Sequence, residues 1–353
     1  MDVAAWCKEC RVWVVAGKGG VGKTTIAAAM ARMAAEAGLS VLVIELEGKQ
    51  GLPHAFGQQE PLSYVPAALF ASGAAVAGPG GADPDPAPAE KAGRGGPSPS
   101  GPVPPGTVWA RRLTPDDALL EYLADHGLHR VSKRLVSSGV LDVVATAIPG
   151  IRDVLVLGKV KQLERADLAD VIVVDAPATG HAMTFLTSAS GLLDAARSGP
   201  VRAQASEVVE LLQDPARCRV LLVTLPEEMP VSETIESAYQ LEDRVGIRLG
   251  PVVVNCAEEM PAGLATTVDD AARSASIALD DGQRRALEQA RRFRLHRAEL
   301  AEEQIARLQR ELPLPHLFVP QLLTESVGPD ELGRLSDALG EEVDAMSPHA
   351  GAA

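Results

Sequence analysis

Residues 17–25 read GKGGVGKTT, and this stretch fits the phosphate-binding loop pattern G-x-x-x-x-G-K-[ST]. Its four fixed positions are filled by Gly17, Gly22, Lys23 and Thr24. An apolar run, residues 12–16, precedes the loop, and an alanine-rich segment, residues 26–37, follows it. Strand, glycine loop and helix form the context in which this pattern binds phosphate. The sequence therefore predicts an α/β domain that binds a nucleoside triphosphate.

The loop is expected to hold phosphate through its backbone and two side chains. Its glycines let backbone N–H groups curl around the β-phosphate, and the helix N-terminus adds partial positive charge. Lys23 is expected to bridge the β- and γ-phosphates, while the Thr24 hydroxyl ligates Mg²⁺. The predicted nucleotide-binding residues of the loop are Gly17, Lys18, Gly19, Gly20, Val21, Gly22, Lys23, Thr24 and Thr25.

Lys18 narrows the choice among the classes of P-loop protein. A lysine at this place resembles the deviant Walker A class: the MinD and ParA ATPases, the nitrogenase iron protein, and the ArsA arsenite-pump ATPases with their tail-anchored-protein-targeting relatives. In those families the lysine reaches across a dimer interface to the partner's nucleotide. A cation supplied in trans stabilises charge on the transferring phosphoryl group. The resemblance implies that Lys18 is catalytic in a dimer, and a solvated loop lysine is the simpler alternative.

A second motif, VIVVDAPATGHAMTFL, occupies residues 171–186. An aspartate that ends a buried apolar strand is the Walker B arrangement, so Asp175 is expected to hold Mg²⁺ together with Thr24. Residues 177–181 are expected to form a turn that follows the γ-phosphate, with Gly180 near the nucleotide. The D-x-P-x-T-G-H pattern resembles the ArsA and tail-anchored-targeting group rather than MinD or ParA.

Residues 41–57, VLVIELEGKQGLPHAFG, lie where that group carries its switch I segment. The group typically has aspartate, proline, alanine and histidine before a phenylalanine-glycine pair, whereas residues 47–50 here are glutamate, glycine, lysine and glutamine. By resemblance, Glu47 is the catalytic residue that positions the attacking water, and Glu45 is a second candidate. Because a misplacement of ~1 Å can cost roughly 100-fold in rate, slow turnover or binding without turnover stays open.

Asn255 and Pro320 resemble the residues that form the adenine pocket in this group. Asn255 follows the apolar run at residues 252–254, and Pro320 follows the run at residues 317–319. An asparagine side chain carries both a donor and an acceptor, so Asn255 can pair with adenine N6 and N7 together. The resemblance therefore favours ATP over GTP, with Mg²⁺ as the metal. The alternative is that both residues only satisfy backbone groups at strand ends.

Short apolar runs recur between helical segments along the whole chain. They lie at residues 12–16, 41–44, 171–174, 220–224, 252–254 and 317–319, with 107–110 as a further candidate. Continuous Val, Ile and Leu runs are typical of parallel strands covered on both faces. The pattern predicts an α/β fold, a doubly wound and mostly parallel sheet of the P-loop NTPase type with a helical subdomain.

One P-loop ATPase domain is expected over residues 1–347. Half of residues 71–106 is proline or glycine, which predicts a flexible insertion within that domain. Residues 113–165 and 184–212 are expected to form the helical subdomain, with a helical piece over 188–212. Residues 281–312 are expected to form a long charged helix with i,i+4 ion pairs on a solvated face, and residues 348–353 a disordered tail.

Charge and cysteine content limit the possible partners and compartment. A formal net charge of −14 and a pI near 5.0 argue against nucleic-acid or anionic-membrane binding. No apolar run approaches the ~18 residues of a membrane span, and the N-terminus lacks a secretory core, so a cytoplasmic protein without membrane insertion is expected. Cys7 and Cys10 form a C-x-x-C that could hold zinc only if a dimer supplies four thiolates.

The favoured functional hypothesis is a nucleotide-gated dimer that couples ATP hydrolysis to an anion- or arsenite-pump-like transporter or to a protein client. Its partner is an identical chain or a related ATPase. The alternative is a nucleotide-binding regulatory subunit with weak hydrolysis that needs a related chain to supply the switch I aspartate. A ParA- or MinD-like positioning role is disfavoured, because residues 341–353 have neither basic nor large apolar character. The client itself is not identified by any motif.

Overall fold

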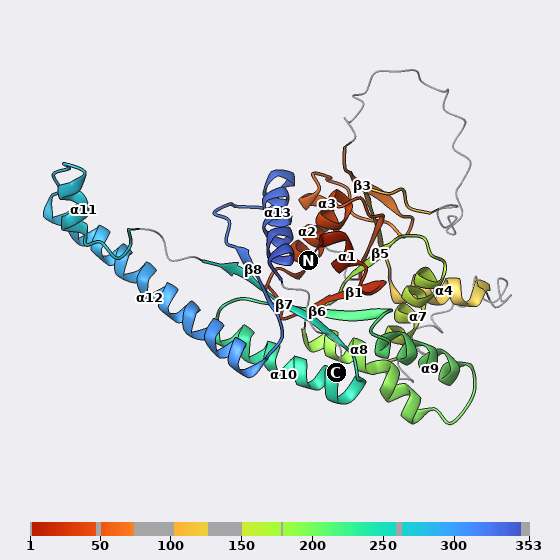
Figure 1. Ribbon diagram of the computed structural model, residues 1–353. Coiled ribbons are helices and arrows are strands. Elements are labelled where there is room, and N and C mark those ends of the chain that lie inside the picture. Colours follow the sequence, from red (N-terminus) through yellow and green to blue (C-terminus); the bar gives the residue numbers. More distant parts are fainter. Residues whose placement is uncertain are drawn as a thin grey trace, which may run out of the picture.

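The structure is a computed structural model that describes residues 2–46, 51–73, 102–125, 150–177, 179–258 and 263–346. Its strands form one sheet in the order β3-β4-β2-β5-β1-β6-β7-β8 (Figure 1). The bounds are β1 Val12–Ala16, β2 Val41–Glu45, β3 Ala67–Ala71, β4 Thr107–Arg112, β5 Val171–Asp175, β6 Cys218–Thr224, β7 Leu249–Ala257 and β8 His316–Pro320. Neighbouring strands are parallel except β3 and β4. The predicted doubly wound, mostly parallel sheet is confirmed.

Helices cover both faces of this sheet. They are α1 Val3–Cys7, α2 Lys23–Glu36, α3 Gly51–Ala55, α4 Pro115–Asp125, α7 Ile151–Arg165, α8 Thr179–Ala195, α9 Pro200–Gln213, α10 Glu228–Val245, α11 Val268–Ser274, α12 Asp281–Glu311 and α13 Pro329–Ala345. On one face α1, α2 and α13 pack against Trp13 and Val15 of β1. On the other, α7 to α10 pack against Val12 and Val14. Because both faces are buried, the strands read as continuous apolar runs.

Strand β3 was not expected from the sequence. Its residues, AALFA, are mostly alanine, which has a low strand propensity, and only one of them is buried. β3 pairs antiparallel with β4 at the sheet edge, and the Ser72 N–H donates to the Gly106 carbonyl at 2.7 Å. The predicted insertion therefore connects two adjacent strands, and its residues 74–101 lie outside the described ranges.

Two local features differ in detail from the prediction. The expected helical piece over residues 188–212 is divided into α8 and α9, because Gly199 has φ +98° and Pro200 begins α9. Residues 179–181, expected in a turn, lie in the first turn of α8. The helices α4, α7, α8 and α9 pack on one another, and their buried residues share one core with the sheet.

The long charged helix is confirmed as α12. Asp280 begins it through a capping box with Gln283. Ion pairs with i,i+4 spacing join Glu288 to Arg292 and Arg307 to Glu311 on its surface. Its C-terminal half packs against α10, while its N-terminal half projects from the body with α11 near the tip (Figure 1). None of the helices in the described ranges has the length and apolar content that a membrane crossing requires.

Candidate nucleotide site

The loop between β1 and α2 is packed tightly against two neighbouring strands. A Cβ atom placed on Gly17 would lie 2.2 Å from the Val223 carbonyl oxygen of β6. One on Gly22, whose φ is +90°, would lie 2.3 Å from Nδ2 of Asn255. Glycine is required at both positions, because any side chain would displace backbone or a buried amide. The backbone of the loop can therefore turn sharply beside the ends of β6 and β7.

The structure brings the predicted phosphate and metal residues together. Lys23 is only 5% exposed, and its Nζ donates to the Lys18 carbonyl oxygen at 3.0 Å. Thr24 Oγ1 donates to Asp175 Oδ2 at 2.7 Å. Parallel strands β1 and β5 are neighbours, so the loop after one and the aspartate ending the other meet at the same edge.

Thr24 and Asp175 fit a magnesium ion by their chemistry. Both offer oxygen donors, which Mg²⁺ prefers, and their hydrogen bond places the two donors side by side. Across the described residues no group of three or more His, Cys, Asp or Glu side chains could hold a metal by itself. A Mg²⁺ ion here would take its other ligands from phosphate oxygens and water, as is usual for this ion.

Two glutamates are candidates for positioning the attacking water. Glu47 lies outside the described residues. The second candidate, Glu45, ends β2, is 1% exposed and pairs in register with Asp175 of β5. A buried carboxylate thus stands next to the predicted metal ligand, at the edge where the loop lies. Gly180 lies in the first turn of α8, which follows β5.

Lys18 differs from Lys23 in where its side chain points. Its Nζ lies 2.7 Å from Glu233 Oε1 on α10, and the two side chains are 31% and 35% exposed. The ammonium group therefore sits at the rim of the loop and not inside it. Sequence reasoning missed Glu233, since it is 215 residues away and occupies an ordinary amphipathic helix.

Asn255 is tied to the phosphate loop. Its Nδ2 donates to the Val21 carbonyl oxygen at 2.9 Å, so the side chain joins the end of β7 to the loop. This contact is the backbone role that the sequence analysis gave as the alternative. The contact with adenine stays a prediction, and it would use the second N–H and the side-chain oxygen of Asn255. Pro320 ends β8, in register with Ala257 of the neighbouring strand.

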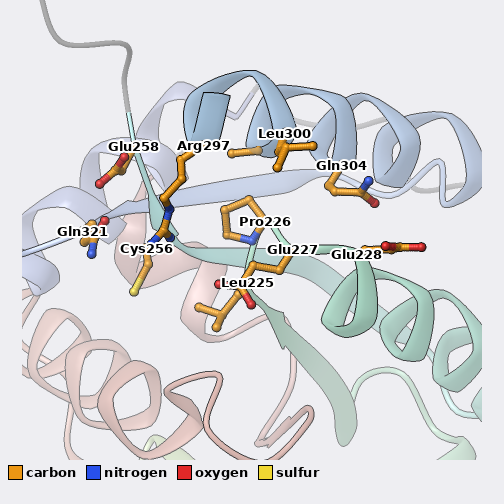
Figure 2. A pocket seen from close by; sticks show the side chains of 11 residues that line it. Leu225, Pro226, Glu227, Glu228, Cys256, Glu258, Arg297, Leu300, Gln304 and Gln321 are labelled. Carbon is orange, nitrogen blue, oxygen red and sulfur yellow. The ribbon is translucent and has the colours of Figure 1, made fainter. Parts of the chain in front are cut away.

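A cavity of about 480 Å³ lies at the carboxyl edge of the sheet, and its wall includes the residues that follow Asn255 and Pro320 in the chain. Cys256 and Gln321, the residues that follow them, line it together with the chain after β6 and one stripe of α12 (Figure 2). From α12, Arg297 points down toward Cys256. The α12 residues in its wall are Arg297, Leu300, Ala301 and Gln304. Their i, i+3, i+4, i+7 spacing places all four on one helix face, and this spacing is visible in the sequence.

The cysteines do not form a surface cluster. Cys7 and Cys10 are both fully buried, and burial raises the pKa of Cys7 to about 12 and that of Cys10 well above its usual value. Thiols in that environment are inert. Zinc shared across a dimer axis is therefore not favoured. Cys218 is buried in the core as well, and burial raises its pKa to about 12.

The glycine loop between β1 and α2, with an aspartate ending β5, defines a P-loop nucleotide-binding protein of the α/β class. Residues 12–343 match the family described as the CobQ/CobB/MinD/ParA nucleotide binding domain, and the chain belongs to this family.

Several relatives are named as ATPases. The chain is 34% identical over 252 residues to the ATPase BagA of Mycobacterium tuberculosis, a match that covers 69% of this chain and 64% of that protein. A candidate ATPase of Mycobacterium bovis matches with the same values. A candidate arsenical pump-driving ATPase of Halobacterium salinarum is 28% identical over 267 residues, 70% of this chain and 36% of that protein. These names confirm the predicted resemblance to the arsenite-pump group.

Proposed function

We propose that this chain is a Mg²⁺-dependent ATPase that works as a nucleotide-gated dimer and drives a transporter or a protein client. The observation that carries the proposal is that the two lysines of the loop differ in burial and in the direction of their side chains. Lys23 is buried within its own site, whereas Lys18 stands partly exposed at the rim, paired with Glu233. A rim lysine can reach the phosphates of a second nucleotide across an interface.

Each residue of the site has a chemical task in this proposal. The loop N–H groups and Lys23 bind the phosphates, and Thr24 and Asp175 hold Mg²⁺. When bound, the ion supplies charge stabilisation for the phosphoryl oxygens. Glu47, or Glu45 beside Asp175, orients the attacking water. Lys18 of the second subunit neutralises charge that develops on the transferred group.

The base is held at the carboxyl edge of the sheet. Asn255 would read the adenine edge with its remaining donor and acceptor, and Pro320 would wall the ring. The cavity next to them offers about 480 Å³, which is ample for a nucleoside. Specificity for ATP over GTP follows from the donor that adenine carries at N6.

The proposed partner rests on the relatives. A relative of this chain is named for driving an arsenical pump, and this supports a transport partner, although the matched region spans only 36% of that protein. The matched region likewise spans less than two thirds of the BagA protein. A homodimer or a heterodimer with a related ATPase would serve equally well. We place this activity in the cytoplasm, where thiols stay reduced.

The test is Mg²⁺-dependent ATP turnover per subunit at rising protein concentration, for the wild type and for Lys18→Ala. Turnover that climbs with concentration in the wild type and is lost in Lys18→Ala is the expected result. Lys8→Ala is the matched control, because Lys8 is an exposed lysine whose ion pair with Asp170 lies away from the loop.

A near-zero rate that does not change with protein concentration, despite tight ATP binding, would contradict the proposal that this chain hydrolyses ATP without a related subunit. It would instead favour the regulatory alternative, in which Glu47 cannot replace the aspartate of switch I. Adding a related ATPase chain should then restore turnover.

A further inference from the structure

Helix α12 is too long for the strands that it connects. It follows β7 and α11 and leads into β8, so it runs back along the sheet from the carboxyl edge. Its 31 residues span about 46 Å, whereas the nine residues of β7 span about 30 Å and the five of β8 about 17 Å. Its buried Leu308 lies near the C-terminal end, where the helix is anchored. The surplus length must therefore extend beyond the carboxyl edge, as Figure 1 shows.

The projecting part has no core of its own. We call residues 263–297, which comprise α11 and the first half of α12, the arm. Among the described residues, α11 contains no buried residue, and the first buried residue of α12 is Ala298. An ion pair between Asp269 and Arg284 joins its two helices. A helical pair without a buried face is only marginally stable alone, so the arm is suited to packing against another surface.

The surface of the arm is apolar and basic. Phe293, Ile277 and Leu287 are 62%, 59% and 48% exposed. The arm carries seven arginines against four aspartates and Glu288, a net charge of +2 within a chain whose total is −14. A large exposed aromatic among arginines is typical of a protein interface. The rest of the chain is strongly acidic and so complements this charge.

The edge beneath the arm is the edge that holds the phosphate loop. Both the loop after β1 and the end of β7 lie at the carboxyl ends of parallel strands. Further exposed apolar side chains lie at this edge: Met229, in the first turn of α10 after β6, is 61% exposed, and Leu323, after β8, is 87% exposed. Exposed apolar groups therefore gather on the arm and on the edge from which it projects.

We propose that the arm is a clasp that grips a second copy of this chain. The inference rests on the proposed dimer, in which two phosphate-loop edges face each other. An arm of 17 residues of α12 overhangs that edge by about 25 Å, so it must lie along the flank of the facing subunit. Phe293 is the apolar anchor, the arginines meet the acidic body, and the edge residues Met229 and Leu323 are available as apolar partners.

The helix that carries the arm also reaches the proposed nucleotide site. Arg297 and Leu300, at the base of the arm, line the same cavity as Cys256, the residue that follows Asn255 (Figure 2). A nucleoside in that cavity would contact the helix that carries the arm. The grip on the second copy should therefore strengthen when nucleotide is bound.

The first test places the photo-crosslinker p-benzoylphenylalanine at position 293 of the full chain. The sample is irradiated with Mg²⁺ and a non-hydrolysable ATP analogue, and adducts are mapped by mass spectrometry. Isotope-labelled and unlabelled chains are mixed, so that adducts between subunits are distinguished from those within one chain. The control carries the crosslinker at position 239, because Tyr239 is 49% exposed but lies near the C-terminal end of α12. Adducts between chains at 293 and not at 239 are expected.

The second test is the dimer dissociation constant of Phe293→Ser, measured by analytical ultracentrifugation with the same analogue. Loss of a buried aromatic anchor should raise this constant by at least about tenfold. Tyr239→Ser should leave it unchanged. Since Phe293 is exposed, the variant should fold normally, and an unchanged unfolding temperature would verify this.

The outcomes separate the clasp from the dimer. If the wild type dimerises but position 293 yields only adducts within one chain, and Phe293→Ser dimerises like the wild type, the clasp is overturned and the proposed function stands. If the wild type stays monomeric with nucleotide at every concentration, both the dimer and the clasp fail.

Discussion

The phosphate loop and the arm are opposites in how they are held. At the loop, Gly17 packs against the backbone of β6 and Gly22 against a buried amide. The side chains of Lys23 and Thr24 both form hydrogen bonds within the protein. In the arm, α11 has no buried residue and Phe293 is 62% exposed. The loop is held by close contacts within its own chain, whereas the arm has almost no buried contacts. Preorganisation suits phosphate chemistry, and a marginal helix suits reversible docking.

The largest expected effect removes the charge of Asp175. Asp175→Asn keeps an oxygen that can accept from Thr24 but loses the anionic Mg²⁺ ligand. Because a metal ion contributes several kcal/mol to the transition state, kcat should fall by about 100- to 1000-fold. Steady-state ATP turnover measures this. Thr24→Ser, which keeps the hydroxyl, is the control, and near-normal turnover in Asp175→Asn would show that Asp175 does not serve the metal.

The next effect tests the tight packing of the loop. In Gly17→Ala the new Cβ would lie 2.2 Å from the Val223 carbonyl oxygen, so the loop must shift. ATP affinity should fall by about 100-fold, which corresponds to about 3 kcal/mol. Gly20→Ala is the matched control, since its φ is +88° but no atom lies within 4 Å of its Cβ. In that variant the free energy of ATP binding should weaken by only about 1 kcal/mol, because of backbone strain. Equal losses in calorimetric titrations would refute the packing argument.

A smaller effect is expected from freeing Lys18. Glu233→Gln removes the charge that holds Lys18 at the rim, at 2.7 Å. A partly exposed ion pair contributes about 0.2–1 kcal/mol, so turnover at low protein concentration should rise by roughly 1.5- to 5-fold. Glu236→Gln, on the same helix but hydrogen-bonded to Gln240, should have no effect. Identical rates in both variants would mean that the Glu233 contact does not restrain Lys18.

The smallest effect is a pH dependence confined to the arm. Hydrogen bonds from Arg291 and Arg292 lower the pKa of Glu288 from 4.5 to about 2. A carboxylate with a depressed folded-state pKa stabilises the helix above the unfolded value, and this stabilisation is lost as pH falls from about 4.5 to about 2. The amide protection factors along α12, which correct for the intrinsic pH dependence of exchange, should fall over that interval and fall less in Glu288→Gln. A pH response of equal size in both proteins would contradict this assignment.

Much of the fold was readable from local pattern. The predicted strands were found because their residues are continuous apolar runs, and α12 because its charges repeat with helical spacing. Strand β3 was missed because an alanine-rich edge strand carries little signal. The break between α8 and α9 was signalled by Gly199-Pro200, which the prediction overlooked.

The sequence by itself determined the phosphate chemistry of this protein. Gly17 to Thr25 are contiguous, and a glycine loop followed by a helix performs its function through its own backbone. The tertiary structure decided which distant groups complete the site: Thr24 meets Asp175, Val21 meets Asn255, and Lys18 meets Glu233. It also decided that α12 overhangs the sheet, because that depends on a helix length compared with a strand length. Contacts between residues hundreds of positions apart arise from chain topology, and no local pattern records them.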